Sequence, residues 1–395
     1  MPNFRCKELL DLNLPFEKDG VSFLWWAKNE HTCLIFTQVL NSSFFLQLSW
    51  DKQGFFIIKA EKTFKPSQIG YLQKALLVFK QNFCKQIISE AFSFKKTHLA
   101  RKTSLIAYDT QKLLDQISLK KKIYVEIGFG SGRHLLFWAN KNKDIFIIGI
   151  EIYTPALEQV AKLALAQNLD NVLLTQNDAR LVFSILQSNS VDKIFLHFPV
   201  PWDKKPHRRV VSKSFVDECL RVLKCGGSFE LRTDSKEYFD FSLQSFLEHE
   251  KLKAQIYKNA SLDISSKYED RWKRQEKDIY DLIVINENSS KELEQIKDFD
   301  LKELCFDKKK LENLRTAFKK QHFKGEDFFL HLEQIYVQEE RLMLKISFGA
   351  FHKPEHAYLL LSKQSEFVFH KPFTTKENLK AFDKLKEILI NLSKN

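Results

Sequence analysis

Residues Glu126-Ile127-Gly128-Phe129-Gly130-Ser131-Gly132 contain three alternating glycines directly behind a short apolar run, Ile123–Ile127. A buried strand that turns through glycines into a helix places backbone N–H groups and a helix N-terminus at the strand's carboxyl end. Open α/β sheets bind nucleotides at this position. These residues therefore predict a nucleotide-cofactor domain in the middle of the chain.

Apolar runs and helical patterns alternate along the chain on both sides of this turn. Strands are expected at residues 123–127, 145–150, 172–174, 193–198, 228–231 and 280–285. Continuous apolar runs are typical of strands that are buried on both faces of a parallel sheet. Their alternation with helices predicts an α/β fold, a Rossmann-like core with a mostly parallel sheet, over residues 96–290.

Acidic residues follow three successive strands of this predicted sheet. A dinucleotide fingerprint would need a glycine where the chain has Arg133, whereas Glu126 directly before the glycines suits a cationic ligand such as S-adenosylmethionine (SAM). A carboxylate at Glu151 could accept both ribose hydroxyls, and Asp178 could accept from an adenine amino group. Any one of these acids alone would more often be a helix N-cap. Together they predict SAM bound by Glu126, Gly128, Gly130, Glu151 and Asp178.

The turn behind the fourth strand carries basic and aromatic residues. Two prolines, Pro199 and Pro201, stiffen it, and Trp202 offers an aromatic face. Lys204, Lys205, Arg208 and Arg209 are expected to contact phosphates. The net charge of +12 also favours a polyanionic partner. The turn therefore predicts contact with nucleic acid beside the methyl donor.

With these motifs in order, the chain resembles the bacterial tRNA (guanine-N7)-methyltransferase family, in a long form with N- and C-terminal extensions. The resemblance covers residues 120–287. The motifs that carry it are the cofactor loop, Gly149-Ile150-Glu151, Asn177-Asp178-Ala179, the turn at 198–209, Leu231-Arg232-Thr233-Asp234 and Ser266-Lys267-Tyr268-Glu269-Asp270-Arg271. It implies a class I methyltransferase core that uses SAM to methylate N7 of a guanine in the variable loop of tRNA.

The family also implies roles for particular residues. It implies SAM contacts from Glu126, Glu151 and Asp178. The residues that it implies for tRNA or guanine contact are Lys204, Asp234, Ser266, Lys267 and Glu269. The family usually has Asp where this chain has Val200, and Thr and Phe where it has Ser266 and Tyr268.

The loss of the family's Asp at Val200 does not exclude catalysis. Guanine N7 carries no proton, so its lone pair can attack the methyl group in line without a general base, and the enzyme's task is alignment. A carboxylate could still stabilise the positive charge that develops on the purine. Asp234 and Glu269 are the expected catalytic carboxylates, and Asp203 in the same turn could substitute.

Two other functions fit parts of the pattern. Amino-group nucleic-acid methyltransferases also place a Pro-Pro-aromatic turn after the fourth strand. Their turn normally starts with Asp or Asn, where this chain has Phe198. A non-catalytic SAM- and RNA-binding protein is the other alternative, motivated by Val200.

The flanking regions carry no catalytic pattern. Residues 1–95 read as a β-rich extension with a helix near 67–90. Residues 291–395 read as α+β, with helices near 307–321 and 375–392 and strands between 332 and 372. The flanks either extend the tRNA-binding surface or play a structural part. The adjacent Trp25 and Trp26 point to opposite faces of a strand, which favours core packing over base stacking.

Six scattered cysteines without CxxC spacing, together with the lack of a signal peptide or of a long apolar run, are typical of a reduced cytoplasmic protein. We expect no membrane partner and no metal, and the pattern gives no oligomeric state.

Overall fold

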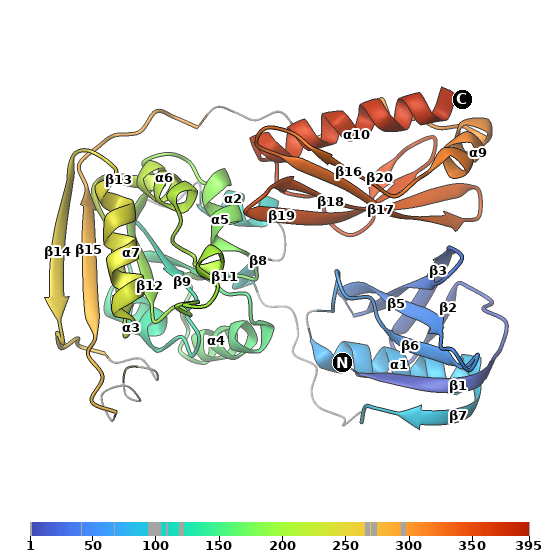
Figure 1. The fold of residues 1–395 in the computed structure, drawn as a ribbon. Coiled ribbons are helices and arrows are strands. Elements are labelled where there is room, and N and C mark those ends of the chain that lie inside the picture. Colours follow the sequence, from blue (N-terminus) through green and yellow to red (C-terminus); the bar gives the residue numbers. More distant parts are fainter. Residues whose placement is uncertain are drawn as a thin grey trace. The chain divides into compact units, whose positions relative to one another are not determined.

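A computed structural model of the chain describes residues 2–40, 42–66, 68–93, 104–107, 110–117, 122–264, 269, 275–293 and 298–394. It divides into two compact units, drawn with their elements in Figure 1. The central unit comprises Lys102–Gln295. The second, called here the flanking unit, combines Met1–Arg101 with Ile296–Asn395. The two flanks, expected as separate domains, therefore lie in one unit.

The central unit contains an eight-stranded sheet in the order β14-β15-β13-β12-β9-β10-β11-β8. Its strands are β8 (Ile106–Ala107), β9 (Ile123–Ile127), β10 (Phe146–Ile150), β11 (Val172–Thr175), β12 (Val191–His197), β13 (Leu223–Thr233), β14 (Leu252–Lys258) and β15 (Tyr280–Asn286). Strands β8 to β13 pair in parallel, and β15 runs antiparallel to both β13 and β14. This arrangement confirms the predicted α/β class with a mostly parallel sheet.

Short helices connect these strands. They are α2 (Thr110–Ile117), α3 (Arg133–Lys141), α4 (Thr154–Ala166), α5 (Ala179–Ile185), the 3-10 turn η1 (Pro206–Arg208), α6 (Lys213–Val222) and α7 (Lys236–Leu247). Ser212 and Ser235 cap α6 and α7, because each hydroxyl accepts a hydrogen bond from a first-turn N–H. In α4, the residues that face the sheet are Leu157, Val160, Ala161 and Ala164. Helical spacing would also place Leu165 on this stripe, but Leu165 is exposed.

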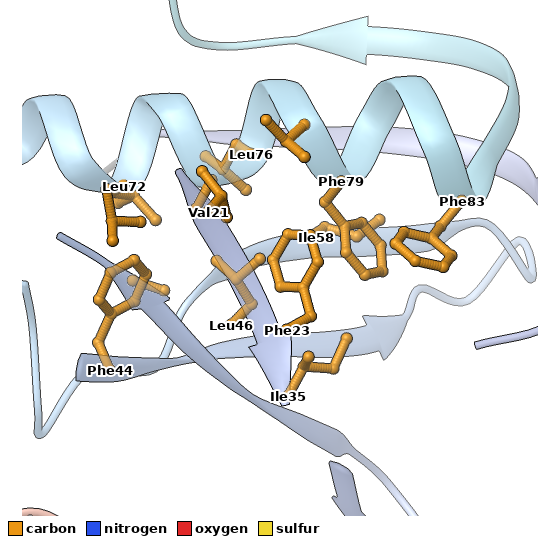
Figure 2. Packing of buried hydrophobic residues seen from close by; sticks show 14 of the residues in the cluster. Val21, Phe23, Ile35, Phe44, Leu46, Ile58, Leu72, Leu76, Phe79 and Phe83 are labelled. Atoms are coloured by element: carbon orange, nitrogen blue, oxygen red, sulfur yellow. The ribbon is translucent and has the colours of Figure 1, made fainter. Parts of the chain in front are cut away.

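The N-terminal half of the flanking unit is an antiparallel sheet covered by one helix. Its elements are β1 (Asn3–Leu9), β2 (Phe16–Lys18), β3 (Val21–Lys28), β4 (Cys33–Val39), β5 (Ser42–Trp50), β6 (Phe56–Ala60), α1 (Ile69–Phe83) and β7 (Cys84–Glu90). Phe79 and Phe83 of α1 pack edge-on against Phe23 of β3, as Figure 2 shows. The helix expected near 67–90 is therefore too long, because Cys84–Glu90 forms a strand that pairs with β1.

Where the structure describes it, the C-terminal half contains five strands and two helices. Its elements are α9 (Lys308–Ala317), β16 (Gln321–Lys324), β17 (Phe329–Gln338), β18 (Arg341–Ala350), β19 (Lys353–Leu361), β20 (Glu366–Phe367) and α10 (Lys376–Lys394). Both expected helices are present, and strands begin earlier than expected, at Gln321. Helix α10 packs on one face of the sheet (Figure 1). Its residues Leu385 and Leu389 join the same apolar cluster as Leu330.

Main-chain, aromatic and ionic contacts join the two halves of the flanking unit. Lys28 of β3 pairs with Val337 of β17. The ring of Phe45 packs edge-on against Tyr358, with centroids 5.0 Å apart. The Lys345 ammonium donates to the Glu61 carboxylate at 2.9 Å, and both side chains are largely buried. The flanks thus form a continuous sheet and a common core.

The adjacent tryptophans of β3 illustrate this arrangement. Trp25 stacks on Phe36 in the cluster that joins the halves, whereas Trp26 packs against the separate core beneath α1. Both therefore serve packing, as their alternation predicted. Within the part of the chain that the structure describes, no helix is both long and apolar enough to cross a lipid bilayer.

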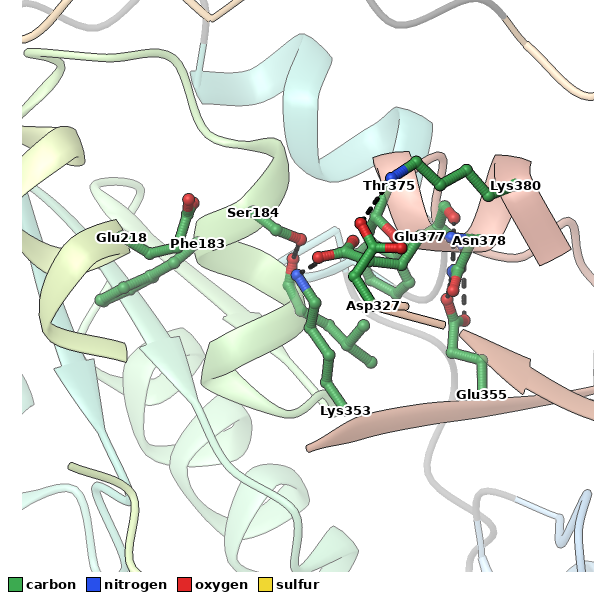
Figure 3. A network of polar contacts seen from close by, with 12 residues as sticks. Phe183, Ser184, Glu218, Asp327, Lys353, Glu355, Thr375, Glu377, Asn378 and Lys380 are labelled. Atoms are coloured by element: carbon green, nitrogen blue, oxygen red, sulfur yellow. Dashed lines mark hydrogen bonds and ion pairs between the residues drawn. The ribbon is translucent and has the colours of Figure 1, made fainter. Parts of the chain in front are cut away.

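A buried acidic side chain anchors the start of α10. The Glu355 carboxylate accepts a hydrogen bond from Asn378 Nδ2 at 2.5 Å (Figure 3). It also accepts from the Phe373 N–H at 3.1 Å. Burial raises the pKa of Glu355 from 4.5 to about 7. The protonated carboxyl is therefore favoured by the folded state more than by the unfolded chain.

This raised pKa makes stability depend on pH. Between about pH 4.5 and about pH 7 the folded state binds more protons at Glu355, so the free energy of unfolding falls as pH rises through this window. We expect Glu355→Gln to remove a dependence of about 3 kcal/mol. Urea denaturation in buffers on both sides of the window measures it. Glu366→Gln, at an exposed residue of β20, is the matched control and should keep the wild-type dependence.

Candidate active site

The carboxyl ends of six parallel strands, β8 to β13, lie at one edge of the central sheet. Glu126 of β9 pairs with Gly149 of β10 and with Phe195 of β12, so the segments that follow these strands begin at the same level. The Gly128 N–H donates to the Ile150 carbonyl at 2.8 Å, which ties the glycine turn to the end of β10. The predicted cofactor residues are thereby brought together.

The glycine turn has left-handed backbone conformations and open space beside it. Gly128, Gly130 and Gly132 have φ values of 68°, 51° and 72°. No atom would lie within 4 Å of a Cβ at Gly128, whereas a Cβ at Gly132 would lie 2.4 Å from Val160 Cγ2. The turn is thus packed tightly against α4 at its end and open at its start. An open turn of N–H groups at a helix N-terminus fits a nucleotide cofactor.

Glu126 lies under this turn and is held by a histidine. Its side chain is only 4% exposed, and its Oε2 lies 2.8 Å from His134 Nδ1. Trp138 Nε1 donates to His134 Nε2 at 2.9 Å, so the imidazole proton lies on Nδ1 and is donated to Glu126. The chain Trp138–His134–Glu126 fixes the carboxylate at the end of β9.

A second histidine lies against the first. The rings of His134 and His197 are 4.5 Å apart, and His197 is the last residue of β12. Burial lowers the pKa of His197 well below its usual range, with a further contribution from the neighbouring His134. His197 is therefore neutral near pH 7. Neither histidine was assigned a role from the sequence, although His134 stands in the first turn of the helix behind the glycines.

The other two predicted cofactor acids also lie at this edge. Glu151 accepts hydrogen bonds from the Gly130 N–H at 3.2 Å and the Tyr153 N–H at 3.0 Å, so its carboxylate rests on the glycine turn. Asp178 is the N-cap of α5 and accepts from the Arg180 N–H at 2.9 Å. The Arg180 guanidinium also binds Asp178, and this hydrogen bond raises the pKa of Arg180.

The proline-rich turn behind β12 is held in shape by a buried arginine. Arg209 is 3% exposed, donates from Nε to the Pro201 carbonyl at 2.7 Å, and pairs with Glu237 at 2.6 Å. Asp203 lies 3.5 Å from the same guanidinium. The expectation that Arg209 contacts phosphate is therefore wrong, because its guanidinium is buried and is neutralised by Glu237 of α7 and by Asp203 of the turn.

The remaining cations of the turn are exposed. Lys204, Lys205 and Arg208 lie in solvent, and the Arg208 guanidinium stacks over the Trp202 ring at 5.2 Å. Trp202 adopts a left-handed backbone with φ of 50°, which turns the chain sharply before the basic residues. Val200 is 61% exposed. The turn thus presents three cations and an aromatic ring.

Arg232 at the end of β13 is the centre of a buried ionic network. Its NH1 donates to Asp281 at 2.7 Å, and its NH2 donates to Glu269 at 3.0 Å and to the Ala260 carbonyl at 2.8 Å. Glu269 is 1% exposed. Burial raises the pKa of Asp281, although the adjacent Arg232 opposes this shift. In the sequence, the signal that could have indicated acidic partners is the position of Arg232 at the end of a buried strand.

Asp234 lies two residues beyond Arg232, at the same edge of the sheet. Its carboxylate accepts from Lys277 Nζ at 3.1 Å, and its side chain is 16% exposed. The predicted substrate residues Ser266 and Lys267 lie outside the described residues, as does Tyr268. No group of three or more His, Cys, Asp or Glu within the described part of the chain could hold a metal ion.

Comparison with known proteins identifies a matching family model and several similar proteins. A family model described as "Putative methyltransferase" matches residues 120–282. The chain is 55% identical over 389 residues to the tRNA (guanine-N(7)-)-methyltransferase of Campylobacter jejuni subsp. jejuni strain 81-176, covering 98% of both chains. Similar proteins of that name occur in Campylobacter fetus subsp. fetus strain 82-40 (45% identity, 98% and 99% coverage) and Helicobacter hepaticus strain ATCC 51449 (34%, 98% and 99%).

The contact between Gly132 and Val160 gives a test of the glycine turn. Gly132→Ala should weaken SAM binding at least about tenfold, because a Cβ collides with Val160 and its left-handed backbone costs roughly 1–2 kcal/mol. Isothermal titration calorimetry with SAM measures the loss. Adding Val160→Ala should restore part of the affinity, since it removes both colliding γ carbons. Gly226→Ala, at φ of 82° in open space, carries the backbone cost alone and should bind SAM normally.

Proposed function

Because the chain belongs to the tRNA (guanine-N(7)-)-methyltransferase family, we propose that it transfers a methyl group from SAM to N7 of a guanine in the variable loop of tRNA. The observation that carries this proposal is the full-length match, 55% identity over 98% of both chains. The site supports it, because the cofactor acids and the exposed cations follow adjacent parallel strands.

The residues at the sheet edge fit the cofactor. SAM supplies an activated methyl group on a cationic sulfonium, together with an ammonium, a ribose and an adenine. Glu126, which is buried and oriented by His134, would accept from the ammonium. Glu151, resting on the glycine turn, would accept from the ribose hydroxyls. Preorganised carboxylates need no reorientation when a cation arrives, which favours binding.

Asp178 is the third cofactor residue, and its surroundings refine its role. Both of its oxygens already accept from Arg180. A carboxylate has about four lone-pair sites, so Asp178 can accept from the adenine amino group while it still caps α5. In this proposal Arg180 positions Asp178 and takes no part in the chemistry.

The chemical step needs alignment more than proton transfer. The lone pair of guanine N7 forms a bond to the methyl carbon as the carbon–sulfur bond breaks. The electron pair of that bond stays on sulfur, which becomes a neutral thioether, and the purine gains the positive charge. No proton moves, so neither His134 nor His197 is required as a base. Holding the two reactants in line supplies the main acceleration.

Asp234 and Glu269 have different parts in this proposal. Asp234 is partly exposed at the end of β13 and would stabilise the charge on the methylated purine or accept from the guanine N1–H and N2–H₂ edge. Glu269 is buried against Arg232, so we assign it as a positioning residue that acts through Arg232. Ser266 and Lys267 remain the proposed tRNA contacts.

The exposed cations of the turn would hold the tRNA backbone. Lys204, Lys205 and Arg208 are free of the ion pairs that bury Arg209, so they can exchange counterions for phosphates. Val200 leaves this turn without the family's carboxylate. Asp203 is the acid nearest to Val200 in the sequence, and its contact with Arg209 holds it within the turn.

Two alternatives predict different products. An amino-group methyltransferase would place the methyl group on an exocyclic nitrogen, and a non-catalytic protein would bind SAM and RNA without product. Neither has support from the relatives' names. The product therefore discriminates between all three functions.

The test is incubation of the purified full chain with labelled SAM and undermodified tRNA, followed by nucleoside analysis. We expect N7-methylguanosine. Glu126→Gln should raise KM for SAM about tenfold or more, since loss of a charged hydrogen bond costs about 1.5–3 kcal/mol. Lys204→Ala should raise KM for tRNA instead. SAM binding without any methylated nucleoside, under conditions where an active relative works, would contradict the proposal.

A further inference from the structure

The positive charge of the chain is concentrated outside the methyltransferase unit. Residues 102–295 carry 29 Lys and Arg against 27 Asp and Glu. The flanking unit, residues 1–101 and 296–395, carries 33 against 23, and so holds ten of the twelve net charges. The basic character that indicates a polyanionic partner therefore belongs mainly to the flanks.

Part of this charge lies on one face of the C-terminal sheet. In the antiparallel pairing of β16 with β17, His322 is opposite His331 and Lys324 is opposite Phe329. The alternate residues, including Leu330, face the core with α10. His322, Lys324, Phe329 and His331 therefore share the opposite face, with His322 and Lys324 exposed. We call these four residues with Lys320 and Phe351 the β16–β17 strip.

The strip alternates rings and cations in close contact. Phe329 stacks on Phe351 with centroids 6.0 Å apart and an interplanar angle of 27°. His322 stacks on Phe329 at 6.1 Å and an angle of 25°. Lys324 Nζ lies 5.5 Å from the centre of the Phe351 ring, which is 48% exposed. Exposed stacked rings beside cations are the surface on which unpaired bases stack.

The cations of this surface are not neutralised by the protein. Among the residues that the structure describes, no acidic side chain pairs with Lys319, Lys320 or Lys324. The nearest acid of β17 on this face, Glu333, is bound by Lys345 and His356. The charge of the strip is therefore available for phosphates.

Another part of the same face is already covered. Tyr336 of β17 and Met343 of β18 lie in the cluster that contains Ala27 and Phe45 of the N-terminal half. Coverage stops short of Phe329, His322 and Phe351, which keep their exposed edges. One face of a continuous sheet is thus used for packing at one end and left to solvent at the other.

We propose that the β16–β17 strip is a second tRNA contact, in which Lys320 and Lys324 bind phosphates and the rings of Phe351, Phe329 and His322 stack unpaired bases. The inference rests on the proposed function for the identity of the RNA. The site at the edge of the central sheet performs the methyl transfer, and the strip adds affinity for RNA that has unpaired bases.

The experiment measures tRNA affinity of the full chain by fluorescence anisotropy at several salt concentrations. Lys320→Ala with Lys324→Ala should weaken binding and reduce the slope of log affinity against log salt by about 1.5, from two lost phosphate contacts. Phe351→Ala should weaken tRNA binding about tenfold through lost stacking, with little change in that slope. It should leave binding of a fully paired RNA duplex of equal length unchanged.

Lys52→Ala with Lys363→Ala is the matched control. It removes the same charge from exposed turns elsewhere on the flanking unit and should keep wild-type affinity and slope. Wild-type tRNA binding by both strip variants would overturn the inference, as would equal loss in the control. If the strip variants lose tRNA affinity but the wild-type chain forms no N7-methylguanosine, the proposed function fails and the RNA contact stands.

Discussion

The parallel pairing of β9 with β10 and β12 is the constraint on which the site depends. Parallel strands that pair in register end together, so the segments that leave them converge without any direct sequence relation. Glu126, Glu151 and the turn behind β12 are distant along the chain, yet all three lie at this edge of the sheet. The glycine turn, which has no side chains at its glycines, then leaves room for a ligand to reach the strand ends.

Burying charge at this edge requires a partner for every charged group. Glu126 is matched by His134, and Arg232 by Asp281 and Glu269. Removing one member of such a pair leaves a desolvated charge, which costs more than the pair contributes. The same rule operates in the flanking unit, where Glu61 meets Lys345 across the junction of its halves. Buried ion pairs thus specify which segments belong together.

Sequence reasoning found what local pattern encodes. The buried strands β9, β10 and β12 were predicted because their apolar runs are continuous, and the acids behind them followed from position. Strand β14 was not predicted, because its apolar residues Leu252, Ala254 and Ile256 alternate with polar ones and form no continuous run, and nearly all of Leu252–Lys258 is exposed. The helix at 67–90 was predicted too long because strand β7 begins at Cys84, directly after Phe83, and no turn residue marks the boundary.

Long-range partners could not be inferred in this way. The burial of Arg209 depends on Glu237 and on the Pro201 carbonyl, and the sequence carries no local mark of either contact. The role of His134 depends on its ring meeting Glu126 eight residues earlier, across a turn of defined shape. The joining of the two flanks into one sheet depends on the pairing of Lys28 with Val337, and no pattern in either segment predicts this pairing.

That union makes the methyltransferase unit an insertion within another folding unit. A chain growing from the ribosome releases Met1–Arg101 first, while Tyr358 and Phe369, which pack against Phe45, are still unsynthesised. The central unit, continuous in sequence, can fold before the flanking unit is complete. The apolar face around Trp25 and Phe45 must wait until the C-terminus emerges. The last strands to be synthesised therefore complete the sheet that the first strands began.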